Sequence, residues 1–170
     1  MIIDKPNFFL LTGGPGVGKT TLIEELRRRG ERVIEETHRR IIREGRAESG
    51  SADLGLLAAQ EDIARFEAMA EVQERVFFDR GVIDSLTPRA PAWMWAAARR
   101  LRYNPTVFVP PPWREIYAQD AERRQTFEDC LATHATILAM LKSLNYQPIE
   151  LPYATTPERA DFVLTVAGMA

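Results

Sequence analysis

The chain has 170 residues and a mass of 19.3 kDa, which is the size of one domain. A composition that is 45% hydrophobic and 27% charged excludes intrinsic disorder, because such a chain can bury a core. The 22 basic and 24 acidic residues give a net charge of −2, which disfavours a dedicated nucleic-acid-binding protein. Cys130 is the only cysteine, so an internal disulfide and a multi-cysteine metal site are excluded. We expect a single domain over residues 1–170.

Membrane and targeting segments are not expected from this sequence. Its longest apolar runs, such as residues 8–11, fall far short of the roughly 18–20 residues that a membrane helix needs. Residues 1–7 lack a basic region followed by a long apolar stretch. We therefore expect a cytoplasmic protein that has neither a membrane nor a nucleic acid as its partner.

Short apolar segments followed by turn residues predict five buried β-strands. In chain order they cover residues 8–12, 32–35, 76–78, 106–109 and 148–151. Segments with helical spacing of apolar residues lie between and after them. These are residues 19–29, a helix capped by Thr37, residues 54–74, 91–101 and 121–144, and a last helix capped by Thr156. The alternation predicts a parallel five-stranded sheet with helices on both faces, the three-layer, doubly wound α/β class.

One segment carries a complete phosphate-binding pattern. Residues 13–20 read Gly-Gly-Pro-Gly-Val-Gly-Lys-Thr and match G-x-x-x-x-G-K-[S/T] between a predicted strand and a predicted helix. Glycines allow the backbone to curl closely around a phosphate, so that successive N–H groups face the anion. We expect Lys19 to reach the β- and γ-phosphates and the Thr20 hydroxyl to hold Mg²⁺. A glycine turn that binds nothing is the alternative.

The expected ligands of this loop are ATP and Mg²⁺, although the pattern alone does not distinguish adenine from guanine. The predicted binding residues are Gly13, Gly14, Pro15, Gly16, Val17, Gly18, Lys19, Thr20 and Thr21.

The loop and the order of the predicted elements resemble the P-loop NTPases. The resemblance is to the small-molecule kinases in particular, and to the AAA-type ATPase domains that are similar to ribosylnicotinamide kinase. It extends from Asn7 to about Gly168. It implies the P-loop NTPase fold, with an active site at the carboxyl ends of the parallel strands and a short lid that carries arginines.

Asp79 directly follows the third predicted strand. It looks like a Walker B carboxylate, which holds Mg²⁺, and Asp79-Arg80-Gly81 resembles the acid-Arg-Ser/Tyr element of nucleoside kinases. The resemblance implies that Asp79 orients or deprotonates an acceptor hydroxyl and that Arg80 contacts phosphate or substrate. Gly81 departs from that element, and an aspartate that only caps the next turn is the alternative. Asp84 is either a secondary acid or a helix cap.

Glu35 and Glu36 end the second predicted strand. The resemblance to deoxynucleoside kinases implies an acid near the acceptor hydroxyl at this place. We expect Glu36 to be this catalytic acid, with Arg39 or Arg40 near an anionic group. An exposed pair of glutamates without a function is the alternative.

A lid is expected over residues 112–124, after the fourth predicted strand. Lid arginines of such kinases close over the phosphates, exclude water and neutralise charge during transfer. The spacing after Asp120 favours Arg123 as the catalytic arginine, with Arg124 as a nucleotide-binding residue and Arg114 as a further candidate. Basic residues on a solvated helix start are the alternative.

Two functions from different classes remain open at this point. The first is an ATP-dependent phosphotransferase that moves the γ-phosphoryl group to a hydroxyl of a nucleoside-like or sugar-like metabolite. The second is an ATP hydrolase or nucleotide-dependent switch with a protein partner, and a module that binds nucleotide without turnover is a third reading. Cys130 is expected in the core, and His38 and His134 show no metal-ligand spacing.

Overall fold

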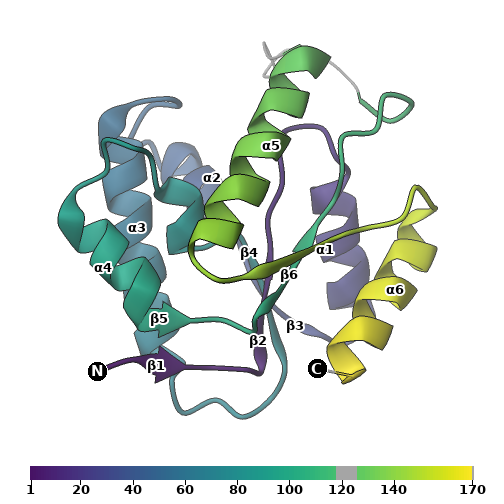
Figure 1. The fold of residues 1–170 in the computed structure, drawn as a ribbon, viewed down its shortest axis with the longest axis horizontal. Coiled ribbons are helices and arrows are strands. Elements are labelled where there is room, and N and C mark those ends of the chain that lie inside the picture. Colours follow the sequence, from purple (N-terminus) through teal and green to yellow (C-terminus); the bar gives the residue numbers. More distant parts are fainter. Residues whose placement is uncertain (118–125, 170) are drawn as a thin grey trace.

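The computed structural model describes residues 1–117 and 126–169. Its centre is a five-stranded parallel sheet with the strand order β3-β4-β2-β6-β7 (Figure 1). The strands are β2 (Phe8–Leu11), β3 (Arg32–Ile34), β4 (Val76–Asp79), β6 (Thr106–Val109) and β7 (Gln147–Glu150). All five predicted strands are confirmed, each to within one residue at either end.

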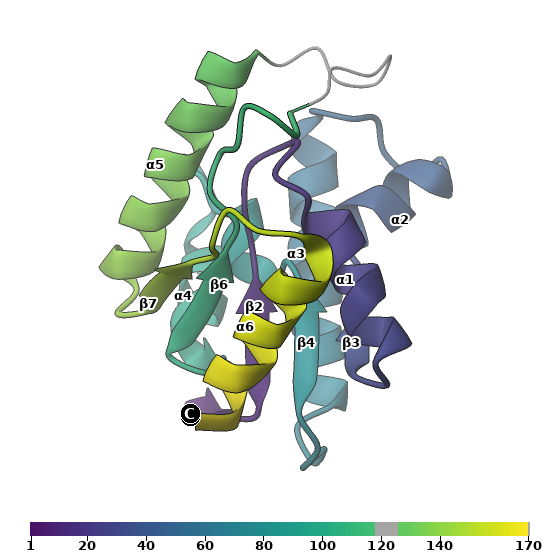
Figure 2. The same cartoon turned by 90° about the vertical axis from the view of Figure 1, so that its right-hand side faces the viewer.

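Within the described ranges, six α-helices and one 3₁₀ turn surround the sheet. They are α1 (Lys19–Arg28), α2 (Thr37–Arg43), α3 (Ala52–Ala68), η1 (Val82–Ser85), α4 (Ala92–Arg100), α5 (Phe127–Ser143) and α6 (Thr156–Met169). Helices α1 and α6 cover one face, and α3, α4 and α5 cover the other (Figures 1 and 2). The three-layer, doubly wound α/β architecture expected from the sequence is therefore confirmed. None of the helices in the described ranges is long and apolar enough to cross a membrane.

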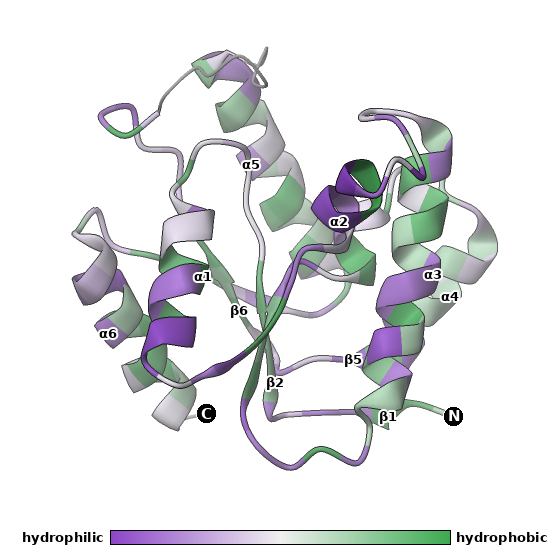
Figure 3. Cartoon of the chain, turned by 180° about the vertical axis from the view of Figure 1, so that it is seen from behind, coloured by the Kyte–Doolittle hydropathy of each residue, from purple (hydrophilic) through white to green (hydrophobic). Residues whose placement is uncertain are grey.

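Alternation along β2 explains why the sheet has two apolar faces. Phe8 and Leu10 point into the core beneath α3, α4 and α5, whereas Phe9 and Leu11 point into the core shared with α1 and α6. All four side chains are buried, as expected for a central parallel strand covered on both faces. Figure 3 shows the same division: the central strands are hydrophobic, and hydrophilic residues lie on the outer surfaces of α1, α2 and α3.

The register of the strands brings distant residues to one edge of the sheet. Leu11, the last residue of β2, lies opposite Asp79 on β4 and Phe108 on β6. Ile34, the last residue of β3, lies opposite Phe78. The loop after β2, the residues after β3 and Asp79 consequently meet at the carboxyl ends of the strands, which is where ligands bind in open α/β sheets.

The structure differs from the sequence expectations in several local features. A short parallel pair, β1 (Ile3–Asp4) with β5 (Leu101–Arg102), was not predicted because each strand has only two residues. Helix α3 ends at Ala68 instead of residue 74, since the carbonyls of Ala70 and Val72 accept hydrogen bonds from the Lys5 ammonium instead of continuing a helix.

Two predicted N-caps are wrong. Glu36, without a side-chain capping bond, occupies the N-cap of α2, and Thr37 lies inside the helix, where its hydroxyl bonds Asp62. At α6 the capping residue is Thr155, whose carbonyl accepts from the Arg159 amide and whose own amide and hydroxyl both donate to Glu158. A threonine at each helix start was recognisable, but neighbouring polar side chains decided which residue caps.

Candidate active site

The loop between β2 and α1 has the conformation that its glycines permit. Gly16 and Gly18 have positive φ angles of 71° and 77°, a region that other residues rarely adopt. Gly18 is the N-cap of α1 and offers no side-chain acceptor to the first turn. The N–H groups at this helix start are therefore left for an external acceptor, and the helix dipole favours an anion.

Residues far along the chain hold this loop from two sides. The thiol of buried Cys130, on α5, donates a hydrogen bond to the Pro15 carbonyl at 3.2 Å. The Arg159 guanidinium, on α6, donates to the Val17 carbonyl at 3.1 Å. A side chain on Gly18 would lie 3.0 Å from that guanidinium. Cys130 is in the core, as expected, and its contact with the loop is an addition that the sequence did not indicate.

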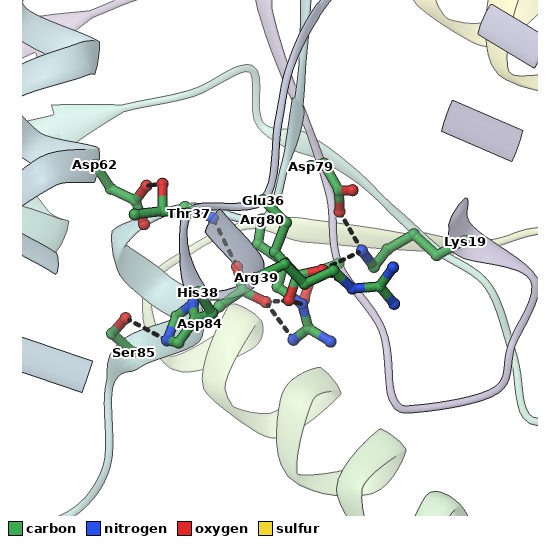
Figure 4. A network of polar contacts seen from close by, with 12 residues as sticks. Lys19, Glu36, Thr37, His38, Arg39, Asp62, Asp79, Arg80, Asp84 and Ser85 are labelled. Carbon is green, nitrogen blue, oxygen red and sulfur yellow. Dashed lines mark hydrogen bonds and ion pairs between the residues drawn. The ribbon is translucent and has the colours of Figure 1, made fainter. Parts of the chain in front are cut away.

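Lys19, the first residue of α1, is buried against two carboxylates (Figure 4). Its ammonium is in direct contact with Asp79, the last residue of β4, and lies 3.6 Å from Glu36. The structure thus brings together three of the residues predicted to be catalytic. Glu35, the other half of the glutamate pair, points outward with a side chain that is 58% exposed, against 11% for Glu36.

Glu36 is surrounded by positive charge. Besides Lys19, it lies 3.1 Å from the Nε of Arg80 and 3.2 Å from the Nε of Arg39. Burial by itself would raise the pKa of Glu36, but the charges of Arg80, Lys19 and Arg39 outweigh burial and lower it. Glu36 is therefore held as a carboxylate at neutral pH. The alternative of an exposed glutamate pair does not fit Glu36, which is largely buried and has cationic neighbours.

Asp79 has the opposite electrostatic balance. Burial raises the pKa of Asp79, and the charge and hydrogen bond of Lys19 offset only part of that effect. Its carboxylate also lines a small depression together with Thr20, whose side chain is exposed at the start of α1. Thr21 differs from Thr20, because its hydroxyl donates back to the Gly18 carbonyl at 2.9 Å.

Asp84 organises the turn that follows β4. It accepts from the Gly81 amide at 2.9 Å, contacts the Thr12 hydroxyl and lies 3.5 Å from Arg80. Arg80 itself has a positive φ of 66°, and its amide bonds the Leu11 carbonyl at 2.9 Å. Of the two readings of Asp84, secondary acid or cap, these contacts favour the cap.

A cavity of about 500 Å³ extends from the loop. Residues 14–21 form its floor, together with Arg39 and Arg80. The rest of its lining comes from residues that sequence reasoning did not select: Trp113, Ile116, Ala154, Thr155, Thr156 and Arg159. The cavity therefore combines the phosphate loop with an aromatic side chain, Trp113.

Arg159 is the most informative of these additions. It is buried, and its Nε and Nη2 have no hydrogen-bond partner among residues 1–117 and 126–169. Burial lowers the pKa of Arg159, and its guanidinium lies 5.7 Å from the Trp113 ring. One signal was available in the sequence: a cation in the first turn of a helix opposes the helix dipole, so its presence there calls for a separate reason.

The predicted lid arginines have different outcomes. Arg123 and Arg124 lie outside the described residues. Arg114 packs over the Phe127 ring at 4.1 Å and lies 3.6 Å from Glu128, so it contacts the start of α5 and does not line the cavity. Arg40 pairs with Glu61, whereas Arg39 lines the cavity.

Solved structures share this fold. The chain superposes on a NadR protein in complex with NR with a TM-score of 0.72 at 18% identity, covering 98% of this chain and 52% of that one. Deoxyadenosine kinase from M. mycoides gives 0.65 at 8% identity, with 96% and 100% covered. Shikimate kinase from Acinetobacter baumannii gives 0.57 at 16% identity, with 96% and 93% covered. The chain thus spans about half the length of NadR.

Comparison of the amino-acid sequence with family models shows the family of the chain. None of the curated proteins compared with the chain matches it. A model of an AAA domain family matches residues 8–159, which include β2, the glycine loop, Glu36, Asp79 and Arg159. The chain therefore belongs to this AAA domain family, within the P-loop NTPases whose fold is that of the small-molecule kinases.

Proposed function

We propose that this protein is an ATP-dependent phosphotransferase that moves the γ-phosphoryl group to a hydroxyl of a small metabolite. The observation that carries the proposal is the buried cluster of Lys19, Asp79 and Glu36 beside an open phosphate loop. A hydrolase needs to position only a water molecule, whereas here two carboxylates with opposite pKa shifts flank one lysine. Two such carboxylates suit separate tasks, one at the metal and one at an acceptor hydroxyl.

The triphosphate would lie along the loop of residues 13–20. Backbone amides at the start of α1 would bind its oxygens. The Lys19 ammonium would leave Asp79 and bind the β- and γ-phosphates instead. The base would lie against the part of the lining that Trp113 and Thr155 supply. Arg159 would contact the nucleotide beside the loop, because its two nitrogens that lack a partner among the described residues would gain most from a polar or anionic ligand.

Thr20 and Asp79 fit a magnesium site. Both present oxygen donors to the same depression, and Mg²⁺ is commonly held by one or two protein oxygens together with phosphate and water. When bound there, the ion would neutralise charge on the phosphates. Asp79 becomes available for this role once Lys19 has turned to the nucleotide.

Transfer then requires mainly positioning. The acceptor oxygen forms a bond to the γ-phosphorus, the bond from that phosphorus to the β–γ bridging oxygen breaks, and ADP leaves. The proton of the acceptor hydroxyl passes to Glu36, which is ionised and fixed by Arg80 and Arg39. Because the transition state is loose, orientation of the hydroxyl and neutralisation of charge contribute more than the basicity of Glu36.

Acceptor-dependent formation of ADP tests the proposal against the hydrolase alternative. The purified protein is given ATP and Mg²⁺, alone and with each member of a panel of nucleosides and sugars, and ADP and the phosphorylated product are measured. We expect ADP formation to increase with a particular acceptor and to equal the amount of phosphorylated product. ADP formation that is the same with every acceptor would favour a hydrolase, and a protein that binds ATP without forming ADP would be a binding module.

A further inference from the structure

A second cleft opens beside the phosphate cavity, between η1 and α5. Its volume is about 350 Å³, within the range of small-molecule sites. Arg80 lines both this cleft and the phosphate cavity, so the two adjoin at this residue. Thr133 on α5 marks the same junction, because it lines the cleft and lies 3.7 Å from the position that a Cβ on Gly14 would take.

The far end of the cleft is apolar on both walls. On α5, Ile137 and Met140 follow Thr133 of the junction at helical spacing along one face. Opposite them lie Ile83 and Leu86, from η1 and the residue after it, and both are buried. Ile137 and Met140 are only partly buried, although they pack against the core. A ligand that covered this stripe would remove apolar surface from water.

The charges that line the cleft are already matched within the protein. In the part of the chain that the structure describes, the charged residues that line it are Arg80 and Asp84. Asp84 is occupied by the Gly81 amide, the Thr12 hydroxyl and Arg80, and Arg80 is additionally paired with Glu36. Among residues 1–117 and 126–169, no second cation lines the cleft to receive a carboxylate or phosphate of a ligand. An anionic group placed among these apolar side chains would lose its hydration without gaining a counter-ion.

We propose that this cleft binds the body of the phosphoryl acceptor, and that the acceptor is a neutral alcohol with an apolar or aromatic part. Its hydroxyl lies at the Arg80 end, beside Glu36 and the phosphate loop, and its apolar part lies between Leu86 and Met140. The inference rests on the proposed phosphotransferase function and names its acceptor class. We expect hydroxy acids and nucleoside monophosphates to be poorer acceptors, because the charges of the described lining residues are matched within the protein.

The first test compares acceptors. Transfer of a labelled γ-phosphoryl group is measured for neutral alcohols with an apolar part, among them the common nucleosides, and for hydroxy acids and nucleoside monophosphates. We expect the best neutral acceptor to exceed every anionic one by at least about 10-fold in kcat/KM, because desolvation of an unpaired charge is costly. A hydroxy acid or a monophosphate as the best acceptor would overturn the inference.

The second test fills the cleft. Ala132 lines it, and Ala135 lies one turn later on the same helix, does not line it and is likewise exposed. We expect Ala132→Trp to raise the acceptor KM by at least about 10-fold, since a bulky side chain would compete for the ligand's place. Ala135→Trp is the matched control and should leave the acceptor KM as it is. Thr136→Trp, at a second exposed lining position, repeats the test independently.

Binding of neutral alcohols to the ADP-bound protein, measured by calorimetry, separates the two proposals. One outcome is that a neutral alcohol binds, that Ala132→Trp weakens this binding and Ala135→Trp does not, and that no phosphoryl group is transferred. This outcome would support the cleft and contradict the phosphotransferase. Transfer that neither Ala132→Trp nor Thr136→Trp affects would support the phosphotransferase and contradict the cleft. If no neutral alcohol binds and none is phosphorylated, the assignment of the cleft is wrong.

Discussion

The hydroxyl of Tyr103 lies directly against Gly81, so that a Cβ on residue 81 would be 2.5 Å from the phenol oxygen and 3.1 Å from its ring carbon. Gly81 has an extended backbone, which any residue can adopt. Glycine is needed here because there is no room for a side chain, and not because of the backbone conformation. This contact accounts for the departure from the acid-Arg-Ser/Tyr element. Tyr103 fills the room that a side chain at residue 81 would need.

Gly81→Ala should lower the free energy of unfolding by ~1–3 kcal/mol, the usual cost of overpacking a core. The same substitution in a Tyr103→Phe background should cost less, because the closest atom has been removed. Urea unfolding of the four proteins measures both effects. Gly55→Ala is the control: it lies in α3 with no atom near its Cβ position, and it should stabilise the protein by ~0.5–1 kcal/mol. Equal costs of Gly81→Ala in both backgrounds would contradict the steric explanation.

Lys19→Met should weaken ATP binding by at least about 10-fold, because a charge-assisted hydrogen bond to phosphate is worth roughly 1.5–3 kcal/mol. Methionine keeps the apolar stem and removes the ammonium. Calorimetry with a non-hydrolysable ATP analogue measures the affinity. Lys142→Met, an exposed position on α5, is the matched control and should not alter it. An unchanged affinity of the Lys19 variant would contradict the assignment of the phosphate loop.

Asp79→Asn should reduce turnover by ~10²–10⁴-fold and weaken nucleotide binding much less. Loss of this carboxylate removes a proposed Mg²⁺ ligand at the reacting groups, but it also frees Lys19 from its partner in the empty site. Steady-state kinetics and calorimetry separate the two effects. Asp161→Asn, on the exposed surface of α6, should behave as the unaltered protein does. Near-normal turnover of Asp79→Asn would make Asp79 a turn residue.

Arg159→Lys should lower the affinity for the nucleotide about as much as Arg159→Met does. A lysine retains the charge, but it has neither the planar group that faces Trp113 nor the fixed geometry of the bond to the Val17 carbonyl. Titration with the ATP analogue measures the affinity of each variant. Arg28→Lys, at an exposed position on α1, is the control. Full rescue by lysine would show that only the charge of residue 159 matters.

Asp62→Asn should change how stability depends on pH. Burial raises the pKa of Asp62 from 3.8 to about 7, while the hydrogen bond from Thr37 opposes the rise. The folded protein therefore keeps a proton that the unfolded chain releases between about pH 4 and pH 7, so this group lowers stability as the pH rises through that window. The variant, whose amide oxygen can still accept from Thr37, lacks this effect.

The measured quantity is the difference in unfolding free energy, variant minus unaltered protein, from pH 4 to pH 8. It should grow by at most about 1.4 kcal/mol per pH unit and level off above about pH 7. Asp84 and Glu61 also raise the pKa of Asp62, and Arg65 lowers it. The pH dependence of the difference therefore reflects the combined effect of burial and these neighbouring charges. A difference that is the same at every pH would contradict the raised pKa.

Local patterns predicted the fold and the phosphate loop. The strands were recognisable because each is a short apolar run buried on both faces, and the loop because eight consecutive residues carry its whole pattern. Asp79 was recognisable as well, since it ends an apolar strand. In each case, residues close together in the chain determine the structure, so the information is present in a short segment.

The resemblance favoured Glu36 over its neighbour Glu35, but only the tertiary structure shows why the two differ: the turn after β3 directs one carboxylate to Lys19 and the other to solvent. The tertiary structure likewise brought Arg159 to a loop more than a hundred residues earlier, and it placed η1 against α5 to form the second cleft. Such contacts depend on strand order and on the crossing of helices over the sheet. A local sequence pattern does not determine these contacts. They decide which charges are paired and where a ligand has room.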